Sequence, residues 1–346
     1  MSKNVSLFLK IFLPLLVVVS AVHICIFYAL GQRNAATTAV KTPPPNADLS
    51  KLPAKQPLTP PAEEMLQRIE APRQQRLPYY DFSRLRPLPA DIRKLGKSGK
   101  SGIIVDLGTR QVLWAKNPVA SVPVASLTKL MTALLLMEDI AGGRLEMETR
   151  LPVTTAATSV ERSCVLGMKK GEFYTTKELI AAMMINSHND AAAQLAAIAS
   201  GNVDNFILRM NQRAAELGLN SAKFNSPNGL PQGKKRLNSR CSVTDITRLC
   251  EALMRYPKLM EFCRMRNYKL HTGKTVYSHN NLLRRNPVPG LFGFKTGYTG
   301  KAGFCLAFGV NRRGRRIIGC VAGFPSARDR DNFCRRLIAW AYSTQR

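Results

Sequence analysis

The stretch Ser126–Ile140, SLTKLMTALLLMEDI, decides the fold of this chain. Its apolar residues recur at helical spacing, at Leu127, Leu130, Met131, Leu134 and Leu135. This period predicts a largely buried α-helix. Ser126 and Lys129 stand three positions apart at the start of that helix, where their side chains share one face. The sequence therefore predicts that a serine hydroxyl and a lysine amine meet at the first turn of a core helix.

Strand patterns lie at both ends of the region around this helix. Gly102–Lys116 alternates apolar and polar residues around a turn, which predicts a hairpin. Phe304–Val310 and Arg315–Phe324 flank Asn311-Arg312-Arg313-Gly314 and predict a second one. Further helices are predicted at Thr175–Met184, Asp190–Ala199, Val243–Arg255 and Asp329–Tyr342. Strands at both ends with helices between them predict an α+β fold in which the end segments share one antiparallel sheet.

The composition restricts the class of protein. The chain has 346 residues, of which 45% are hydrophobic, and 51 Lys+Arg against 22 Asp+Glu give a formal charge of +29. It is too apolar for a disordered polycation, and its charge fits nucleic acid, an anionic membrane or an anionic polymer outside the cell. The four histidines are scattered, with no H-E-x-x-H and no paired C-x-x-C, so no metal site is predicted.

The amino-terminal residues indicate which of these three anionic partners the chain meets. Residues 11–31 carry no formal charge and are long enough to cross a hydrocarbon core of ~30 Å, which predicts a signal-anchor helix after a short cytoplasmic tail, residues 1–10. A cleaved signal remains the alternative, because Val19-Ser20-Ala21 has the form of a cleavage site. Residues 32–98 are rich in proline and predict a basic linker, which leaves 99–346 as the folded domain. We expect that domain outside the cytoplasm, in the periplasm or on the wall side, where nucleic acid is not a partner.

Seven of the eight cysteines lie beyond residue 31: Cys164, Cys241, Cys250, Cys263, Cys305, Cys320 and Cys334. An odd number leaves at least one unpaired. A turn at residues 311–314 would place Cys305 opposite Cys320, and we expect the two as small core residues on one sheet face rather than as a disulfide.

Three short motifs occur in a fixed order: Ser126-Leu127-Thr128-Lys129 at a helix start, Ser187-His188-Asn189 in a break between helices, and Lys295-Thr296-Gly297 at a strand start. A lysine that is desolvated beside a second cation has a lowered pKa, and its neutral amine can take the serine proton. The first motif alone is weak, since a capping serine followed by a surface lysine has the same pattern. Together, S-x-x-K, a middle motif usually written S-D-N, and K-T-G mark class A β-lactamases and penicillin-binding proteins.

From Ser101 to Arg346 the sequence resembles the low-molecular-mass penicillin-binding proteins, the serine D-Ala-D-Ala carboxypeptidases of the S11 peptidase family. The resemblance extends to whole blocks: ASLTKLMTALL, MINSHNDAAAQLA, LGLNSAKFNSPNGLP and FGFKTGYTGKAGFCLA. It implies a fold like that of β-lactamases and transpeptidases, with helices packed on both faces of an antiparallel sheet. It also implies a reaction through an acyl-enzyme without cofactor or metal.

The resemblance assigns roles to the motif residues. Ser126 would be the acylated nucleophile and Lys129 its general base, while Ser187 would relay the proton to the leaving D-alanine. Asn189 would hydrogen-bond the substrate backbone. Lys295 would add positive charge near the base and the product carboxylate.

The strand motif and the last helix would complete the substrate site. Thr296, which precedes Gly297, would donate a hydrogen bond to the carboxylate. The N–H groups of Tyr298 and of the nucleophile would form the oxyanion hole. Arg330 resembles the family's carboxylate-side arginine, with Arg328 as a near neighbour. His188 replaces the small residue that the family places there, and we expect its side chain to turn outward, away from the substrate.

The resemblance implies that the enzyme removes the terminal D-alanine of peptidoglycan stem pentapeptides, that β-lactam antibiotics inhibit it covalently, and that the amino-terminal helix holds it at the cell membrane. A D,D-endopeptidase that cleaves peptide cross-links would use the same residues. A class A β-lactamase would need an activating glutamate, for which Glu216 in E-x-x-L-N is the candidate. A polymer-binding module with an inactive core is the non-enzymatic alternative. A Ser-His-Asp hydrolase lacks the G-x-S-x-G turn here.

Overall fold

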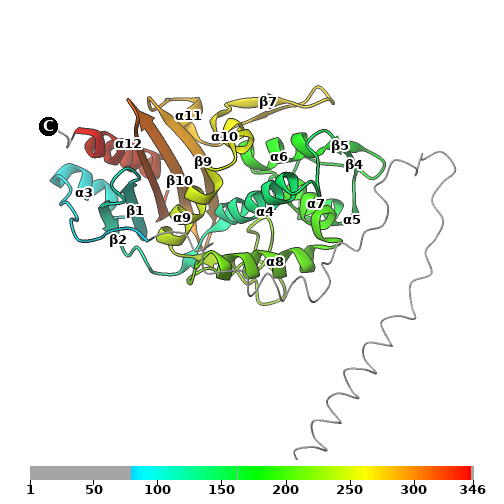
Figure 1. The fold of residues 1–346 in the computed structure, drawn as a ribbon, viewed down its shortest axis with the longest axis horizontal. Helices are drawn as coiled ribbons and strands as arrows, with labels where there is room; N and C mark the ends of the chain where they lie inside the picture. The colour runs from blue at the N-terminus through cyan, green and yellow to red at the C-terminus, as the bar shows by residue number, and fades with distance from the viewer. Residues whose placement is uncertain (1–78, 162, 344–346) are drawn as a thin grey trace, which may run out of the picture. The chain divides into compact units, whose positions relative to one another are not determined.

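The computed structural model describes residues 79–161 and 163–343. Its main sheet is antiparallel and has five strands in the order β2-β1-β11-β10-β9 (Figure 1). The strands are β1 Ser101–Asp106, β2 Val112–Lys116, β9 Leu291–Thr299, β10 Gly303–Arg312 and β11 Arg315–Phe324. β1 pairs with β11, so the two ends of the folded sequence share one sheet, as predicted.

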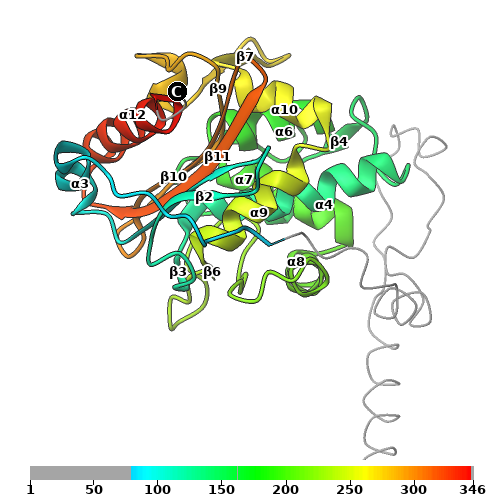
Figure 2. The same cartoon turned by 60° about the vertical axis from the view of Figure 1, so that its left-hand side comes forward.

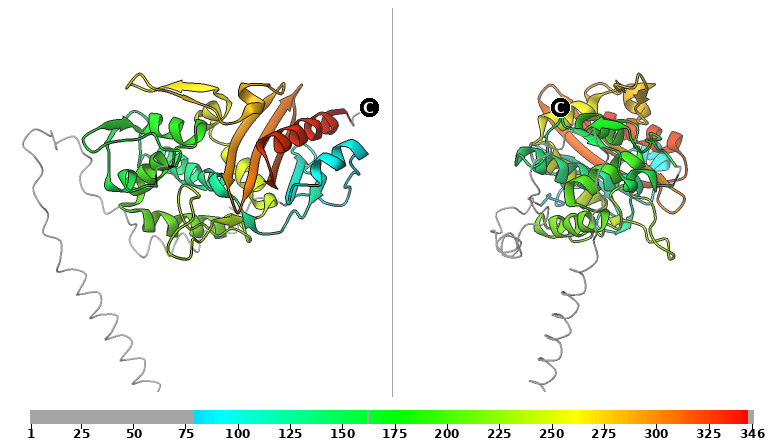
Figure 3. Two further views of the ribbon diagram at one scale, coloured as in Figure 1. Left: turned by 180° about the vertical axis from the view of Figure 1, so that it is seen from behind. Right: turned by 90° about the vertical axis from the view of Figure 1, so that its right-hand side faces the viewer.

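Helices cover both faces of this sheet, which confirms the predicted α+β layout (Figure 2). One face carries α3 Ala90–Gly96, α11 Asn281–Arg284 and α12 Ala327–Ser343. The packing of α12 on β10 and β11 is seen from behind in Figure 3. The other face carries α4 Lys129–Ala141, α9 Val243–Leu253 and α10 Pro257–Arg264. The apolar side chains of the two faces form two separate clusters, as expected for three packed layers.

The four helices that follow α4 directly in the sequence form a lobe beside the sheet. They are α5 Thr155–Thr158, α6 Thr176–Ile185, α7 Asn189–Ser200 and α8 Val203–Glu216. Thr175 and Glu178 cap the start of α6 reciprocally, which fixes the helix that leads into the S-H-N motif. Three two-stranded ribbons join these parts: β3 Val122–Pro123 with β6 Arg240–Cys241, β4 Arg150–Pro152 with β5 Phe173–Thr175, and β7 Asn267–Lys269 with β8 Thr275–Tyr277.

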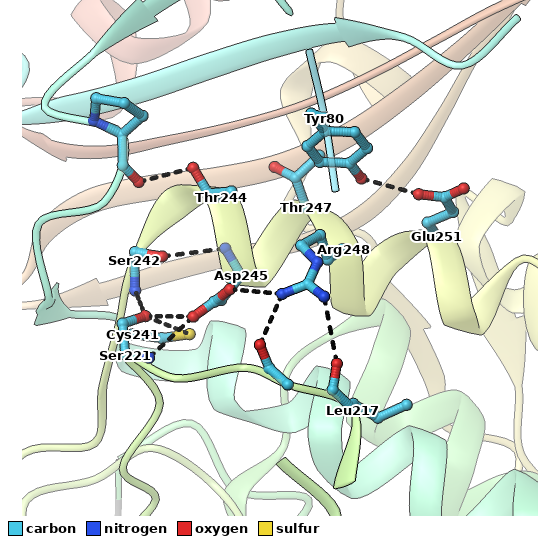
Figure 4. A network of polar contacts seen from close by, with 12 residues as sticks. Tyr80, Leu217, Ser221, Cys241, Ser242, Thr244, Asp245, Thr247, Arg248 and Glu251 are labelled. Carbon is cyan, nitrogen blue, oxygen red and sulfur yellow. Dashed lines mark hydrogen bonds and ion pairs between the residues drawn. The ribbon is translucent and has the colours of Figure 1, made fainter. Parts of the chain in front are cut away.

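Helix α9 ties several segments to the back of the sheet (Figure 4). Ser242 caps its start by accepting a hydrogen bond from the backbone of Asp245. The guanidinium of Arg248, which is 1% exposed, donates to the carbonyl oxygens of Leu217 and Gly218 and to the Asp245 carboxylate. Further along the helix, Glu251 accepts a hydrogen bond of 3.0 Å from the Tyr80 hydroxyl.

Tyr80 belongs to the stretch that composition assigns to the linker, and there the prediction is wrong for residues 79–98. Tyr80 and two later side chains, Leu88 and Ile92, are buried, and the short helix α3 packs on α12. Three apolar residues at irregular spacing among prolines produce no detectable period, so composition alone hides this contact. The predicted tail, anchor and first part of the linker, residues 1–78, lie outside the described residues. Within the described part, no helix has the length and hydrophobicity needed to cross a membrane.

The predicted pairing of Cys305 with Cys320 is also wrong. The turn between β10 and β11 consists of two residues, Arg313 and Gly314, both with positive φ, so the strands continue to Arg312 and Arg315. Cys320 therefore faces Ala307, and the register shifts next to Cys305. Both sulfurs are nonetheless buried in one core cluster, as expected, and all seven cysteines of the described part are free.

Candidate active site

Ser126 lies in a single turn of 3-10 helix, η3 Ala125–Thr128, which connects β3 to α4. The predicted helix thus begins with a tighter turn than expected. Ala125 has φ +47°, a left-handed conformation that costs a residue with a Cβ atom about 1–2 kcal/mol. Such strained backbone is typical of functional sites, where the surrounding packing holds it in place.

Two glycines pack against the backbone of this turn. A side-chain carbon at Gly229 would lie 2.1 Å from the carbonyl oxygen of Ala125 and 3.0 Å from the nitrogen of Ser126. A carbon at Gly297 would lie 3.0 Å from the carbonyl oxygen of Val124 and 3.2 Å from the Ser126 nitrogen. A side chain would clash with this backbone at Gly229 and crowd it at Gly297, so the serine is held between β9 and the segment around residue 229.

Lys129 is fully buried, and its amine has three partners. Nζ lies 3.1 Å from the Ser126 hydroxyl oxygen, 2.7 Å from Oδ1 of Asn189 and 2.7 Å from the carbonyl oxygen of Asn228. The last two groups can only accept a hydrogen bond. When the amine is neutral, it donates its two hydrogens to them, and its lone pair is left for the Ser126 hydroxyl. The geometry therefore orients Lys129 as a base toward this serine.

The charge around Lys129 favours that neutral form. Burial, followed by the positive charge of Lys295, holds the pKa of Lys129 well below its usual value. Lys295 is 3% exposed, and burial lowers its pKa to about 8. Neither lysine has a carboxylate partner among the residues that the structure describes. The buried positive charge of Lys295 therefore makes a site that suits a carboxylate ligand.

The S-H-N motif is brought to Lys129 by the break between α6 and α7. Ser187 is buried and adopts φ +69°, and Asn189 begins α7. The backbone N–H of Asn189 donates to the Cys164 carbonyl at 2.8 Å, and its side-chain amide donates to the Ser163 carbonyl at 2.5 Å. The Asp190 carboxylate accepts from the backbone of Leu166 and of Gly167, each at 2.9 Å. The segment 163–167 thus fixes the residue that holds Lys129.

His188 does not turn outward as predicted. Its side chain is only 5% exposed, and burial lowers its pKa to about 4. Within the described residues, its Nδ1 atom is buried without a hydrogen-bond partner. The imidazole is therefore neutral at ordinary pH and adds no charge to the site.

The K-T-G residues and Tyr298 follow one another on β9, the edge strand beside η3. Tyr298 is 57% exposed, and its ring stacks on that of Phe304 at a centroid distance of 4.2 Å. Arg330 lies on α12 and is buried, with its guanidinium paired to the Asp331 carboxylate and bonded to the Cys305 carbonyl. Its positive charge contributes to the lowered pKa of Lys295, so it acts on the site electrostatically.

The motifs alone missed Asn228, Gly229 and the segment 163–167. Asn228 and Gly229 belong to the block SPNGLP, for which only the family resemblance gives a signal, because neither residue type nor spacing links it to Lys129. Glu216, the candidate β-lactamase glutamate, forms an ion pair with Arg213 on its own helix. In the described part of the chain, no group of three or more His, Cys, Asp or Glu side chains could hold a metal ion.

Comparisons with known proteins identify one family. Residues 92–326 match the family model for D-alanyl-D-alanine carboxypeptidase, peptidase S11. D-alanyl-D-alanine carboxypeptidase DacF of Bacillus subtilis is 30% identical over 252 residues, which cover 72% of this chain and 64% of that protein. A D-alanyl-D-alanine endopeptidase of Pseudomonas aeruginosa is 30% identical over 210 residues, 60% of this chain and 65% of its own. The chain therefore matches just under two thirds of the length of these two relatives.

Solved structures show the same fold. Penicillin-binding protein D2 of Listeria monocytogenes, in its cefotaxime-bound form, aligns with a TM-score of 0.64 and 26% identity over 71% of this chain and 97% of its own. Penicillin-binding protein 6B of Escherichia coli aligns with a TM-score of 0.67 and 26% identity over 75% of this chain and 80% of its own.

Proposed function

Because the chain belongs to the S11 peptidase family of D-alanyl-D-alanine carboxypeptidases, we propose that it removes the terminal D-alanine of peptidoglycan stem pentapeptides. The observation that carries this proposal is the buried Lys129 amine, 3.1 Å from the Ser126 hydroxyl and beside a second buried cation. This arrangement supports Ser126 as the nucleophile and Lys129 as the base that activates it.

In the acylation step, Ser126 Oγ attacks the carbonyl carbon of the penultimate D-alanine while neutral Lys129 takes the hydroxyl proton. The N–H groups of Ser126 and Tyr298 donate hydrogen bonds to the carbonyl oxygen and stabilise the negative charge that develops on it. When the peptide bond breaks, the proton passes by way of Ser187 to the nitrogen of the leaving D-alanine. Water then hydrolyses the ester on Ser126, and the enzyme is regenerated.

The carboxylate of the leaving D-alanine binds at the middle of β9, where the structure places the K-T-G residues that the sequence pattern assigned to a strand start. Lys295 supplies the positive charge, and the Thr296 hydroxyl donates a hydrogen bond. Arg330, on α12, adds to the positive potential at this place without contact. A direct bond from Arg330 to the substrate would require its guanidinium to leave Asp331 and the Cys305 carbonyl. We therefore assign Arg330 to the carboxylate site through its charge rather than through contact.

The test is the intact mass of the protein after treatment with penicillin, with peptide mapping of the adduct. One covalent adduct on Ser126 is expected, together with release of free D-alanine from a pentapeptide. Ser126→Ala should abolish both, and normal D-alanine release by that variant would refute the proposal. Lys129→Ala should lower the acylation rate by about 10²–10⁴-fold, the usual contribution of a general base. Rapid turnover of penicillin instead of a stable adduct would indicate a β-lactamase.

A D,D-endopeptidase is the second candidate, favoured by the match to the endopeptidases of Pseudomonas aeruginosa and Escherichia coli. The same nucleophile and base would cleave a peptide cross-link instead of a terminal residue. Digestion of isolated peptidoglycan separates the two activities. Dimeric muropeptides split into monomers would identify an endopeptidase, and pentapeptides shortened to tetrapeptides would identify a carboxypeptidase.

The proposal includes a location and a class of inhibitor. Residues 11–31 would anchor the chain in the cell membrane, and the linker that follows would hold the catalytic domain on the periplasmic or wall side. β-Lactam antibiotics would acylate Ser126 as substrate analogues. Labelling of intact cells with a fluorescent penicillin, followed by membrane fractionation, tests both statements, and a labelled protein in the soluble fraction would indicate a cleaved signal.

A further inference from the structure

We propose that a basic loop, Gln232–Leu237, docks the acyl side of the substrate and selects peptides that carry carboxylates there. The inference rests on the proposed function and names a recognition surface outside the catalytic motifs. Its sequence is QGKKRL, and Lys234, Lys235 and Arg236 form its exposed tip.

The loop is an ordered hairpin. The backbones of Gln232 and Leu237 exchange two hydrogen bonds, of 2.9 and 2.8 Å. Gly233 and Arg236 both adopt positive φ, and the Arg236 N–H closes the turn on the Gly233 carbonyl at 2.9 Å. The three cations are therefore presented together on a defined turn, so binding a ligand need not order the backbone of the loop.

The same segment of chain reaches the nucleophile. Asn228 accepts a hydrogen bond from Lys129, and Gly229 packs on the backbone before Ser126, as described above. Lys234 follows Gly229 by five residues, so its Cα is within about 18 Å of that of Gly229 at 3.3–3.6 Å per residue. An extended peptide covers the same distance in about five residues. The cations thus lie within reach of substrate residues a few positions from the reacting bond.

The hydrogen-bond partners of Lys129 indicate on which side of the reacting bond the loop lies. Asn189, the proposed contact for the substrate backbone, and Asn228 both accept hydrogen bonds from its Nζ. Lys295, the proposed contact for the leaving carboxylate, stands on β9 instead. The loop follows the segment that binds Lys129 and does not follow β9, so we place it with the acyl side of the substrate and not with the leaving D-alanine.

The charges of the loop lack compensation. Residues 217–240 contain five Lys or Arg and no Asp or Glu. Within the described part of the chain, Lys234 and Lys235 have no carboxylate partner, and Arg236 has one, Glu161, at 3.9 Å between two largely exposed side chains. A pair so exposed contributes little. Adjacent like charges repel one another, and an anionic ligand relieves that repulsion. A peptide with two carboxylates on its acyl side has the complementary charge.

The experiment compares two pentapeptides that end in D-Ala-D-Ala. One carries two carboxylates on its acyl side, and the other is the same peptide with those carboxylates amidated. The variant combines Lys234→Gln, Lys235→Gln and Arg236→Gln in the full chain. The matched control combines Arg93→Gln, Lys94→Gln and Lys97→Gln, which remove the same charge from exposed positions at α3, on the face of the sheet opposite α4.

For the loop variant, kcat/KM on the acidic peptide should fall about tenfold at low ionic strength, mainly through KM. The effect should shrink in 0.5 M salt, where the Debye length is only a few ångströms. The amidated peptide and the rate of acylation by benzylpenicillin should change less than twofold, and the control variant should match the wild type on both peptides. An equal loss on both peptides, or no loss on either, would overturn the inference.

Three other outcomes are informative. If the loop variant loses only its affinity for vesicles of anionic phospholipid, the loop is a membrane contact and the inference is wrong. If the wild-type protein neither releases D-alanine from either peptide nor reacts with penicillin, the proposed function itself fails. Wild-type activity that is equal on both peptides would refute only the role of the loop.

Discussion

Gly229 and Ala125 lie in backbone contact, so close that a methyl group on the glycine would stand 2.1 Å from the alanine carbonyl oxygen. Both residues have positive φ, Gly229 at +85° and Ala125 at +47°. The turn that carries Ser126 thus contains a strained residue, Ala125, whose backbone packs directly against Gly229. The segment around Gly229 packs against the backbone of the proposed nucleophile and also accepts a hydrogen bond from the proposed base.

Gly229→Ala should displace this turn and slow acylation by penicillin by well over tenfold. Gly233→Ala is the matched control, because Gly233 also has positive φ but open space around its α-carbon. The control should lose only about 1 kcal/mol of stability, the cost of a left-handed alanine, and should keep its acylation rate. Equal acylation rates in the two variants would show that the contact with Ala125 is dispensable.

The charge of Lys295 should set the acid limb of the pH profile. Activity requires neutral Lys129, so kcat/KM falls as the pH drops through the pKa of that lysine. Lys295→Met removes a neighbouring positive charge, which stabilises the ammonium form of Lys129 and raises its pKa. The acid limb should therefore move to higher pH. Lys295→Arg keeps the charge and should leave the acid limb where it is. An acid limb that does not move in Lys295→Met would show that the charge of Lys295 does not affect the pKa of Lys129.

An alkaline limb should come from Lys295 itself. Burial lowers its pKa to about 8, so its charge is present below that pH and lost above it. KM for a peptide with a free terminal carboxylate should rise above pH 8, while a peptide amidated at that carboxylate should show no such rise. In Lys295→Arg the rise should be absent, since arginine keeps its charge. Stopped-flow or steady-state kinetics from pH 6 to 10 provide the test.

The segment 79–98 should stabilise the domain. A chain that starts at Gly99 lacks Tyr80, Leu88 and Ile92, and burying side chains of this size contributes several kcal/mol in total. Its melting temperature should be lower by about 10 °C than that of a chain that starts at Tyr79. Tyr80→Phe removes only the hydrogen bond to Glu251 and should cost about 1 kcal/mol. Equal melting temperatures of the two truncated chains would show that this segment does not stabilise the domain and is part of the linker.

Cys164 should be the reactive thiol of the domain. It is the exposed one among seven free cysteines of the described part, and its sulfur donates to the Asn186 carbonyl, next to Ser187. In a Cys25→Ser background, Ellman's reagent should modify one thiol in the folded protein and the other six only in denaturant. Modification should slow acylation by penicillin, and Cys164→Ser should be resistant to the reagent. Rapid reaction of a second thiol would contradict the packing.

The sequence predicted the fold where its signals are local and repeated. The period of residues 126–140 and the alternation near both termini predicted the core helix and the shared sheet, because each element needs one apolar face. The pairing of Cys305 with Cys320 failed, since two turn lengths fit the same residues and the register depends on which backbone conformation Arg313 and Gly314 adopt. The assignment of residues 79–98 to the linker failed for another reason: the buried side chains of Tyr80, Leu88 and Ile92 stand at irregular spacing among prolines and produce no period.

The same distinction holds for the candidate site. Ser126, Lys129 and Lys295 could be selected beforehand, because a nucleophile and its base need particular chemical groups. Asn228 takes part through its backbone carbonyl, which every residue possesses, so its residue type carries no signal. The outward turn expected for His188 failed because the packing of α6 and α7 around the motif, and not the motif itself, decides which side chain is buried.

The free cysteines have a consequence for how the chain matures. A protein exported to an oxidising compartment normally risks mispaired disulfides while it is unfolded. Here the native state crosslinks none of its seven described thiols and hides six of them in its core. For an exported chain, the core therefore has to close over these six thiols before they are oxidised, and no disulfide among the seven has to form in the native domain.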